Sequence, residues 1–566
     1  MPIIGIDLGT TNSLVSYWID DGVKIIPNAF GNNLTPSVIS VDENAEIFVG
    51  QVAKERLITH PHLTAAAFKR YMGTTKVVKL GKYKFLPEEL SSLVIRSLKQ
   101  DAEAYLGETI NEAVISVPAY FNDAQRRATK RAGELAGLKV ERLINEPSAA
   151  AGAYGIHQQK SETKFLIFDL GGGTFDVSIV EIFENVMEVK AIAGDNYLGG
   201  EDFTNALLSA FAKHYKMDEK NIEQKIYVAI KKQAELCKQS LSKSTVGTMR
   251  CHINGNILEM NVERNEFFTT TKELVNRLRI PVERALKDAE IRADELDSVI
   301  LVGGATRMPM IHTLVSRLLG RFPSCNLNPD EVVVIGAGIQ AAMKERNVVL
   351  QEIVLTDVCP YTLGIEVSVS HNTGQHENGH FAPIIERNST IPVSRVERFY
   401  TIADNQTAIV VKIFQGESRL IKNNIYLGEI SIKVPPAPAG RQAIDVRFTY
   451  DINGILEVEV IVVETGISKR IIIEESPGTI SKIDIENRLK ALAEFKMHPR
   501  ERQENQLLVA RGERLFEESL GDRRMEIAAI LQHFEGVLNR QNDREIKKAA
   551  GLFRTKLDEL ERRQEY

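Results

Sequence analysis

The sequence predicts a mixed α/β protein that continues into an antiparallel β-sandwich and ends in helices. Up to about residue 350, apolar β-rich runs alternate with helical stretches, which is typical of an α/β architecture. Between residues 357 and 473, short alternating strands separated by turn residues predict an antiparallel sandwich. After residue 476, apolar residues recur at helical spacing among dense charges of mixed sign, which predicts a helical bundle.

The strands and helices of the first part follow from the same patterns. Residues 113–117, 164–168 and 298–302 are expected to be buried strands, and residues 123–135 and 231–241 are expected to be helices. Ligands of α/β folds bind beyond the carboxyl ends of the strands. Glycine-rich turns of this chain follow such strands, so we expect the ligand site there.

The second half is expected to contain short strands and then helices. Asn453-Gly454 predicts a tight hairpin turn, and the proline-rich residues 435–440 predict a loop. Residues 481–484 resemble a capping box and introduce the helical end. The expected strands of this part are residues 409–413, 443–448, 455–460 and 470–473.

Composition limits the class of protein and of partner. The 566 residues suggest roughly three or four domains, and 43% hydrophobic with 26% charged residues is typical of a globular protein. A formal net charge of -6 gives no reason to expect nucleic acid or a membrane as partner. The four cysteines are scattered, which argues against a zinc site or a disulfide framework.

No apolar run reaches the ~18 residues of a membrane span, and the chain enters a strand at once, so we expect a cytoplasmic protein.

Two glycine-rich segments repeat one pattern, in which an apolar run ends in Asp and continues with Leu-Gly and hydroxyl residues. They are residues 5–13 (GIDLGTTNS) and 168–178 (FDLGGGTFDVS). Glycine lets backbone N–H groups approach a phosphate closely, and hydrated Mg²⁺ prefers carboxylates such as Asp7, Asp169 and Asp176. Either segment alone could be an ordinary hairpin turn. Two copies together predict two related lobes that close on one nucleotide.

Several other residues allow two interpretations. Lys69 could offset developing charge on a phosphate, or it could be a surface charge. Glu146 could cap a helix or bind a water, and Arg307, after a glycine pair, could stack on a purine. A polar loop is expected to be solvated rather than metal-binding, although it contains His371, His376 and His380.

In this order, the motifs resemble those of the 70-kDa heat-shock chaperones of the DnaK type. The similar segments of the first part are GIDLGTTNS, SVPAYFNDAQRRATKRAG, INEPSAAAGAYG, FDLGGGTFDVS, LGGEDF and VGGATRMP. The similarity continues through DVCPYTLGIE, NSTIPVSR, DNQTAIVV and YDINGILEV to about residue 473, and it is weaker in the helical end. The compact length and the variation in the second half are most similar to the HscC subgroup.

The resemblance implies an architecture of four parts. Residues 1–348 would form an α/β actin-like ATPase domain with two lobes and a ribonuclease-H-like duplication. Residues 349–357 would be an interdomain linker, residues 358–475 an antiparallel β-sandwich that binds peptide, and residues 476–566 a C-terminal α-helical lid. The protein would be an ATP-dependent molecular chaperone that binds and releases extended apolar polypeptide segments, with ATP or ADP and Mg²⁺ as cofactors. A J-domain cochaperone would be a partner, whereas the need for a nucleotide-exchange factor stays open because residues 243–265 are shorter than in the family.

The matching motifs also imply roles for single residues of the ATPase domain. Lys69 would position the attacking water, and the full catalytic set would be Lys69, Glu146, Asp169, Thr174 and Asp176. Mg²⁺ would be held, mainly through waters, by Asp7, Glu146, Asp169 and Asp176. The nucleotide would contact Asp7, Gly9, Thr10, Thr11, Asn12, Gly171, Gly172, Gly173, Gly199, Gly200, Glu235, Lys238, Ser242, Gly303, Gly304, Arg307 and Asp330.

Further roles follow for the remaining parts. The peptide groove would be lined by Ile365, Phe399, Ile409 and Val411, and arched over by Ser368 and Ile402. Val354, Leu355 and Asp357 would form the docking part of the linker. A J-domain cochaperone would meet Arg142, Asn145 and Ser148.

Three alternatives remain beside a general chaperone. A sugar-kinase-type phosphotransferase shares the duplicated hairpins, and so does a filament-forming actin relative, but neither needs the sandwich and helices after residue 357. The third is a specialised ATPase that binds a single client. The polar Ser368 in the predicted arch keeps this last alternative open.

Overall fold

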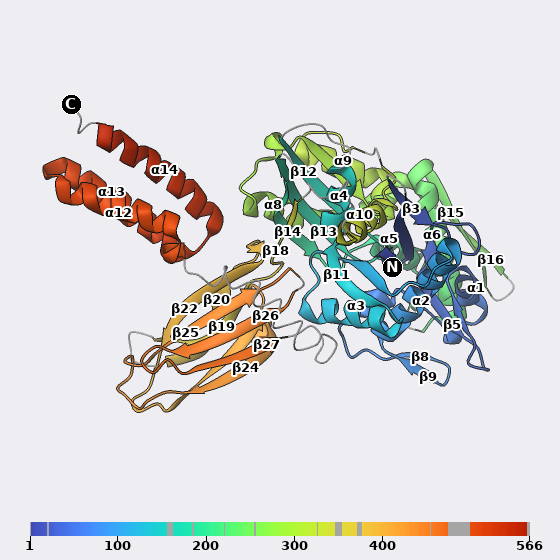
Figure 1. Ribbon diagram of the computed structural model, residues 1–566. Helices are drawn as coiled ribbons and strands as arrows, with labels where there is room; N and C mark the ends of the chain where they lie inside the picture. The colour runs from blue at the N-terminus through green and yellow to red at the C-terminus, as the bar shows by residue number, and fades with distance from the viewer. Residues whose placement is uncertain are drawn as a thin grey trace. The chain divides into compact units, whose positions relative to one another are not determined.

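The computed structural model describes residues 2–19, 22–155, 162–183, 186–219, 221–253, 256–324, 327–345, 354–370, 376–452, 454–473 and 499–562. The chain divides into two compact units, Met1–Pro360 and Tyr361–Tyr566. Figure 1 shows sheets with flanking helices in the first unit, and strands followed by helices in the second.

The first sheet is built around the N-terminal strand. It consists of β1 (Ile3–Asp7), β2 (Asn12–Ile19), β3 (Gly22–Ile26), β4 (Thr35–Pro36), β10 (Glu112–Val117) and β11 (Lys139–Asn145). Its order is β11-β10-β1-β2-β3, with β4 paired to β2. β10 runs parallel to β1, whereas β2 is antiparallel to it. Asp7 therefore lies at the carboxyl end of a central strand.

The second sheet repeats this arrangement. It contains β12 (Glu162–Leu170), β13 (Phe175–Phe183), β14 (Val186–Asp195), β17 (Ser298–Val302) and β18 (Val354–Val358) in the order β17-β12-β13-β14-β18. β17 is parallel to β12, and β13 is antiparallel to it. The path β17-β12-β13-β14 thus matches β10-β1-β2-β3, so the repeat predicted from the two glycine-rich segments is present in the strand topology.

Helices α4 and α10 join the cores of the two sheets. One core contains Ile4 and Ile6 of β1, and another contains Phe168 and Phe175 of the second sheet. A third cluster includes residues of both sheets together with α4 (Glu146–Gly155) and α10 (Val332–Lys344). A Cβ atom at Gly336 of α10 would lie only 1.9 Å from the Ala149 carbonyl oxygen of α4, so this crossing needs glycine.

The remaining elements of the first unit surround these sheets. The expected helix over residues 123–135 is α3, with the same bounds, and the expected helix over 231–241 is part of α6. The helices are α1 (Gln51–Thr59), α2 (Pro87–Leu106), α3 (Asp123–Leu135), α5 (Gly200–His214), α6 (Gln224–Lys243), α7 (Arg264–Thr270), α8 (Lys272–Asp288) and α9 (Pro309–Leu319). The smaller strands are β5 (Val38–Val41), β6 (Ile47–Val49), β7 (Thr64–Ala66), β8 (Val78–Leu80), β9 (Tyr83–Phe85), β15 (Val246–Ile253) and β16 (Asn256–Glu263).

Two antiparallel four-stranded sheets open the second unit, as the sequence predicts. One has the order β20-β19-β23-β24, with β19 (Leu363–Ser370), β20 (His376–Ile385), β23 (Ala408–Gln415) and β24 (Ile425–Lys433). The other has the order β22-β25-β26-β27, with β22 (Val393–Tyr400), β25 (Ala443–Tyr450), β26 (Leu456–Val462) and β27 (Ser468–Ile473). The short β21 (Thr390–Ile391) precedes β22. Buried side chains alternate along these strands, and Gly454 has a φ of 83°, as a tight turn requires.

Among the described residues, three helices form a bundle with its own core at the end of the second unit. They are α12 (Gln503–Glu518), α13 (Gly521–Arg540) and α14 (Asp543–Arg562). Their shared core contains Leu515, Leu531, Phe534 and Phe553, and the rings of Phe534 and Phe553 stack with centroids 4.7 Å apart. The expected capping box at residues 481–484 lies outside the described residues. Within the described part of the chain, the helices are too short or too polar to cross a membrane.

Candidate functional site

The first glycine-rich segment forms the turn between β1 and β2. A Cβ atom at Gly9 would lie 2.0 Å from the Asn12 carbonyl oxygen, so only glycine fits this turn. The Ser13 Oγ accepts a hydrogen bond from the Gly9 backbone N–H at 3.2 Å, and the Ser37 Oγ donates to the Gly9 carbonyl oxygen at 2.8 Å. The turn that carries Thr10 and Thr11 is therefore fixed by its neighbours.

The second glycine-rich segment forms the matching turn between β12 and β13. Asp169 and Asp176 face each other across this hairpin. The turn is braced by the start of α5, because the Gly200 N–H donates to the Gly171 carbonyl oxygen at 2.9 Å and the Glu201 N–H donates to that of Gly172 at 2.8 Å. Thr174, at the end of the turn, is buried.

The two glycine-rich turns meet. A Cβ atom at Gly172 would lie 2.1 Å from the Thr11 Oγ1, and one at Gly173 would lie 3.0 Å from the Thr10 Cγ2. A Cβ atom at Gly199 would lie 2.5 Å from the Gly173 nitrogen. The structure therefore brings Thr10, Thr11, Gly172, Gly173 and Gly199 together, and each glycine is required by close packing.

Buried charges lie at the carboxyl ends of the central strands. Lys69 Nζ donates to Glu146 Oε1 at 2.9 Å, and both side chains are nearly inaccessible to water. The Ser116 Oγ donates to Asp7 Oδ1 at 2.8 Å, and the Tyr120 backbone N–H donates to Asp176 Oδ1 at 3.1 Å. Sequence reasoning missed Ser116 and Tyr120, because nothing in the chain marks an ordinary Ser or a backbone N–H as a carboxylate partner.

These carboxylates hold protons more tightly than usual. Burial, followed by the charge of Glu146, raises the pKa of Asp7 to about 7 and that of Asp176 to about 8. The same causes, in the same order, raise the pKa of Asp169 well above its ordinary value. Without a cation, bound protons therefore neutralise part of the negative charge of these carboxylates near neutral pH.

The carboxylate site fits a hydrated magnesium ion. Asp169 Oδ2 is buried without a hydrogen-bond partner, which leaves a carboxylate oxygen free for a water or an ion. Among the described residues, no three acidic, His or Cys side chains come close enough to hold a metal directly. Mg²⁺ keeps much of its water in proteins, so a set of carboxylates too far apart for direct binding is compatible with binding through waters.

A second group of predicted residues lies on α6 and α5. Lys238 Nζ contacts Glu235 Oε2 at 2.7 Å and donates to the Gly200 carbonyl oxygen at 3.0 Å. Thr204 Oγ1 donates to Glu235 Oε2 at 2.6 Å. Burial alone would raise the pKa of Glu235, but Lys238 and these hydrogen bonds outweigh it and lower the pKa. Thr204 was not predicted; only its place one turn after Gly200 could have indicated it.

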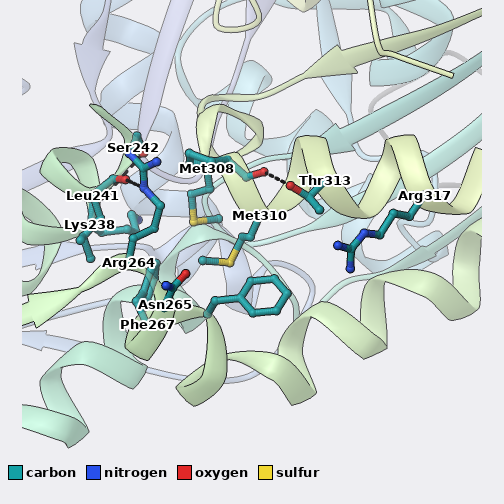
Figure 2. Close-up of a pocket in the computed structure, with 12 residues that line it drawn as sticks. Lys238, Leu241, Ser242, Arg264, Asn265, Phe267, Met308, Met310, Thr313 and Arg317 are labelled. Atoms are coloured by element: carbon teal, nitrogen blue, oxygen red, sulfur yellow. Dashed lines mark hydrogen bonds between the residues drawn. The ribbon is translucent and has the colours of Figure 1, made fainter. Parts of the chain in front are cut away.

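A pocket lined by both polar and apolar side chains continues from this group. It has a volume of about 320 Å³ and is lined by Lys238 and Ser242 on α6 together with Phe267, Met308 and Met310. Figure 2 shows the side chains of Met308 and Met310 next to each other in this pocket. The neighbouring Gly303–Arg307 turn places Arg307 Nη2 2.7 Å from Asp330 Oδ2, and a Cβ atom at Gly304 would lie 2.7 Å from Asp330 Oδ1.

The predicted linker residues belong to β18, a strand of the second sheet. β18 pairs in parallel with β14, with Val354 opposite Val186 and Leu355 opposite Met187. Asp357 is buried. Its Oδ2 accepts hydrogen bonds from Asn145 Nδ2 at 2.7 Å and from Ser148 Oγ at 3.1 Å.

Two of the residues predicted to meet a J-domain are thus covered. Asn145 is 4% and Ser148 1% exposed, and both are bound to Asp357. Arg142 Nη1 donates to Gln340 Oε1 at 2.8 Å. Burial lowers the pKa of Arg142, and the charge of Asp357 acts against this.

The predicted groove residues lie on both sheets of the sandwich. Ile365 on β19 and Val411 on β23 are buried, whereas Phe399 on β22 and Ile409 on β23 are half-buried. Of the predicted arch pair, Ile402 is 42% exposed, and Ser368 Oγ lies 2.6 Å from Asn378 Oδ1. The expected polar loop is in part a strand, because β20 contains His376 and His380, while His371 lies outside the described residues. His380 Nε2 lies 3.2 Å from Glu377 Oε2.

Taken together, these features define a protein with a duplicated α/β unit that carries paired glycine turns, followed by a β-sandwich and helices. Comparison with known proteins matches residues 3–564 to the Hsp70 protein family. Chaperone protein DnaK of Thermotoga petrophila is 43% identical over 470 residues, which is 81% of this chain and 77% of the relative. Chaperone protein DnaK of Thermosipho africanus is 40% identical over 515 residues, which is 89% of this chain and 84% of the relative.

The chain therefore belongs to the Hsp70 family. This confirms the expected function, that of an ATP-dependent molecular chaperone, together with its ATPase activity and its use of ATP or ADP with Mg²⁺. The comparisons do not favour a phosphotransferase, a filament protein or a single-client ATPase. The relatives carry the DnaK name, so the HscC subgroup stays an expectation.

Proposed function

We propose that this chaperone hydrolyses Mg-ATP between the paired glycine turns and uses the reaction to control a peptide groove in the sandwich. The single observation that carries the proposal is the cluster of Asp7, Asp169, Asp176, Glu146 and Lys69 at the strand ends beneath these turns. The ATPase domain would span residues 1–348, the linker 349–357, the peptide-binding sandwich 358–475 and the helical lid 476–566. The repeated strand path supports an actin-like fold with a ribonuclease-H-like duplication.

The phosphates would bind to the backbone N–H groups of the two turns. Thr10, Thr11 and Asn12 would contact them from one side, and Gly171, Gly172, Gly173 and Thr174 from the other. Mg²⁺, when bound, neutralises charge on the phosphates, and Asp7, Glu146, Asp169 and Asp176 would hold its waters.

Lys69 would orient the attacking water. Glu146 holds the Lys69 Nζ at 2.9 Å, so the ammonium group is preorganised before the nucleotide arrives. In phosphoryl transfer, positioning and charge stabilisation supply most of the rate enhancement. A fixed cation beside a group of carboxylates is suited to that task.

The nucleoside would lie against α6. Gly199 and Gly200 would lie between the phosphates and the side chains of Glu235 and Lys238. Lys238 Nζ donates hydrogen bonds to the Gly200 carbonyl oxygen and to Thr204 Oγ1. Glu235 would accept hydrogen bonds from the ribose. The purine would enter the pocket beside Ser242, bounded by the turn that contains Gly303, Gly304 and Arg307 and by Asp330.

The sandwich would bind an extended apolar segment of an unfolded polypeptide. Main-chain hydrogen bonds would supply affinity, and a pocket at Ile409 would select an apolar side chain. Ile365, Phe399 and Val411 would line the groove, with Ser368 and Ile402 above it. The hydrogen-bonding distance between Ser368 and Asn378 favours a second candidate, in which this polar arch restricts the protein to one specialised client.

The linker would transmit the state of the nucleotide. Val354, Leu355 and Asp357 belong to β18, which extends the second sheet, so a change in that sheet changes the contacts of the linker. A J-domain cochaperone would act near Arg142, Asn145 and Ser148, where Asp357 is anchored. We further propose a cytoplasmic location, with no nucleic-acid or membrane partner.

ATP hydrolysis by the purified chain, titrated with Mg²⁺ and then with a library of apolar peptides, tests this function. We expect hydrolysis to require Mg²⁺ and to be stimulated by many peptides. Stimulation by very few peptides would favour the single-client candidate. Hydrolysis that no peptide alters would overturn the proposed coupling.

A further inference from the structure

Arg70 forms an ion pair that the nucleotide site above does not use. Its Nη2 atom donates to the two carboxylate oxygens of Asp202 at 3.2 and 3.1 Å, and to the Tyr197 carbonyl oxygen at 3.1 Å. The side chains of Arg70 and Asp202 are only 16% and 20% exposed. One guanidinium nitrogen therefore has three acceptors in a contact that is largely shielded from water.

The two ends of this bridge are anchored in different cores. Arg70 belongs to the short helix η2 (Phe68–Tyr71), and Phe68 is packed in the core of the first sheet. Asp202 lies in the first turn of α5, and the next residue, Phe203, is packed in the core of the second sheet. The Arg70–Asp202 bridge thus joins the two halves of the first unit.

The bridge also contacts the second glycine turn at both ends. A Cβ atom at Gly173 would lie 2.8 Å from the Arg70 Cγ, so the arginine stem packs against this turn. At the other end, Asp202 Oδ2 accepts a hydrogen bond from the Gly199 N–H at 2.8 Å, and Gly199 packs against Gly173. Movement of the turn away from η2 would therefore break the ion pair.

We propose that the Arg70–Asp202 bridge holds the two glycine turns together around the nucleotide and limits the rate at which nucleotide leaves. The proposal rests on the nucleotide site proposed above. Release requires the turns to separate, and separation breaks this shielded ion pair and its hydrogen bonds, which costs free energy. Arg70 is a positioning residue here, because it acts through the turns.

The dissociation rate of a fluorescent ADP analogue from the full chain, followed by stopped flow after addition of excess ATP, tests the bridge. Arg70→Met keeps an apolar stem against Gly173 and removes the guanidinium. Asp202→Asn keeps an acceptor for the Gly199 N–H and removes the charge. We expect each variant to release nucleotide about ten-fold faster or more, whereas single-turnover hydrolysis changes by less than about two-fold.

Two comparisons separate the bridge from a general loss of stability. The double variant is expected to release nucleotide no faster than the single variants, because each single substitution already breaks the Arg70–Asp202 contact. Lys231 and Glu201 form a neighbouring ion pair at 2.6 Å between α6 and α5, whose buried residues share one core. Lys231→Met therefore removes a similar pair that does not cross between the halves, and it should leave the release rate unchanged.

Each contrary result has its own meaning. Unchanged release in both variants, beside normal nucleotide binding by the unmodified chain, would overturn the bridge and leave the nucleotide site intact. Slower hydrolysis with unchanged release would also overturn it, since Arg70 would then act on the phosphates. If the unmodified chain binds no nucleotide, the proposed site fails first. If Arg70→Met does not fold, Asp202→Asn and Arg70→Lys test the same contact, and Arg70→Lys should restore part of the slow release.

Discussion

The proposed nucleotide site and the proposed peptide groove are built from opposite kinds of side chain. At the proposed nucleotide site, Lys69 and Asp176 are buried ionisable groups whose partners come from separate segments of the first unit. In the groove, Ile409 and Phe399 are apolar and half-buried. A buried charge without its partner is costly, whereas an apolar groove responds mainly to a change in volume. The nucleotide site is therefore expected to tolerate far less change than the groove.

The largest effect is expected at Lys69, the proposed catalytic lysine. Lys69→Met should lower single-turnover ATP hydrolysis by about 100-fold or more, because a fixed charge beside the reacting phosphate is lost. Nucleotide affinity should change much less. The matched control is Lys164→Met, because Lys164 is partly exposed and its Nζ lies 3.8 Å from Glu181 Oε1. Hydrolysis at the normal rate in the Lys69 variant would remove this residue from the mechanism.

A substitution in the groove should have the next largest effect. Ile409→Phe should lower the affinity for apolar peptides by about ten-fold, because the larger ring fills the proposed pocket. Val410, the next residue on β23, is 52% exposed, so Val410→Phe adds the same ring outside the groove. Fluorescence anisotropy with a labelled peptide measures both. Equal affinities for the two variants would mean that peptide binds elsewhere.

A smaller effect is expected at the linker. Asp357→Ala leaves Asn145 Nδ2 and Ser148 Oγ without their acceptor, which should weaken the attachment of the linker. Stimulation of hydrolysis by peptide should fall by about five-fold, in the range of typical coupling energies. Thr356→Val removes only a long hydrogen bond of 3.4 Å to the Met187 carbonyl oxygen and serves as the control. Full stimulation of the Asp357 variant would contradict the assigned coupling.

The smallest effect concerns pH. Because burial raises the pKa of Asp176 from 3.8 to about 8, the folded protein binds more protons than the unfolded chain between these pH values. The melting temperature of the magnesium-free protein should therefore fall as the pH rises from about 6 to about 8, a range that lies between the unfolded and folded pKa values of Asp176. Asp176→Asn should flatten this decrease, and Mg-ATP should oppose it. A melting temperature that rises with pH in the variant and the unmodified chain alike would contradict the assigned burial.

Much of the architecture could be predicted from local patterns. The helix at 123–135, the buried strands at 113–117, 164–168 and 298–302, and the hairpins of the sandwich all appear where periodicity and turn residues indicate them. These features depend on side chains within one segment, so the sequence carries the necessary information. The paired glycine turns were found for the same reason, since each is a short run with its own steric demands.

The pairing of charges could not be predicted in this way. Lys69 and Arg70 are adjacent in the sequence, yet Lys69 contacts Glu146 of α4 and Arg70 contacts Asp202 of α5. By itself, the sequence determined the elements, the repeated turns and the acids that end the strands. Only the tertiary structure decided which charge meets which, because burial and distance, which set the strength of an ion pair and the pKa of a carboxyl group, arise when separate segments pack together.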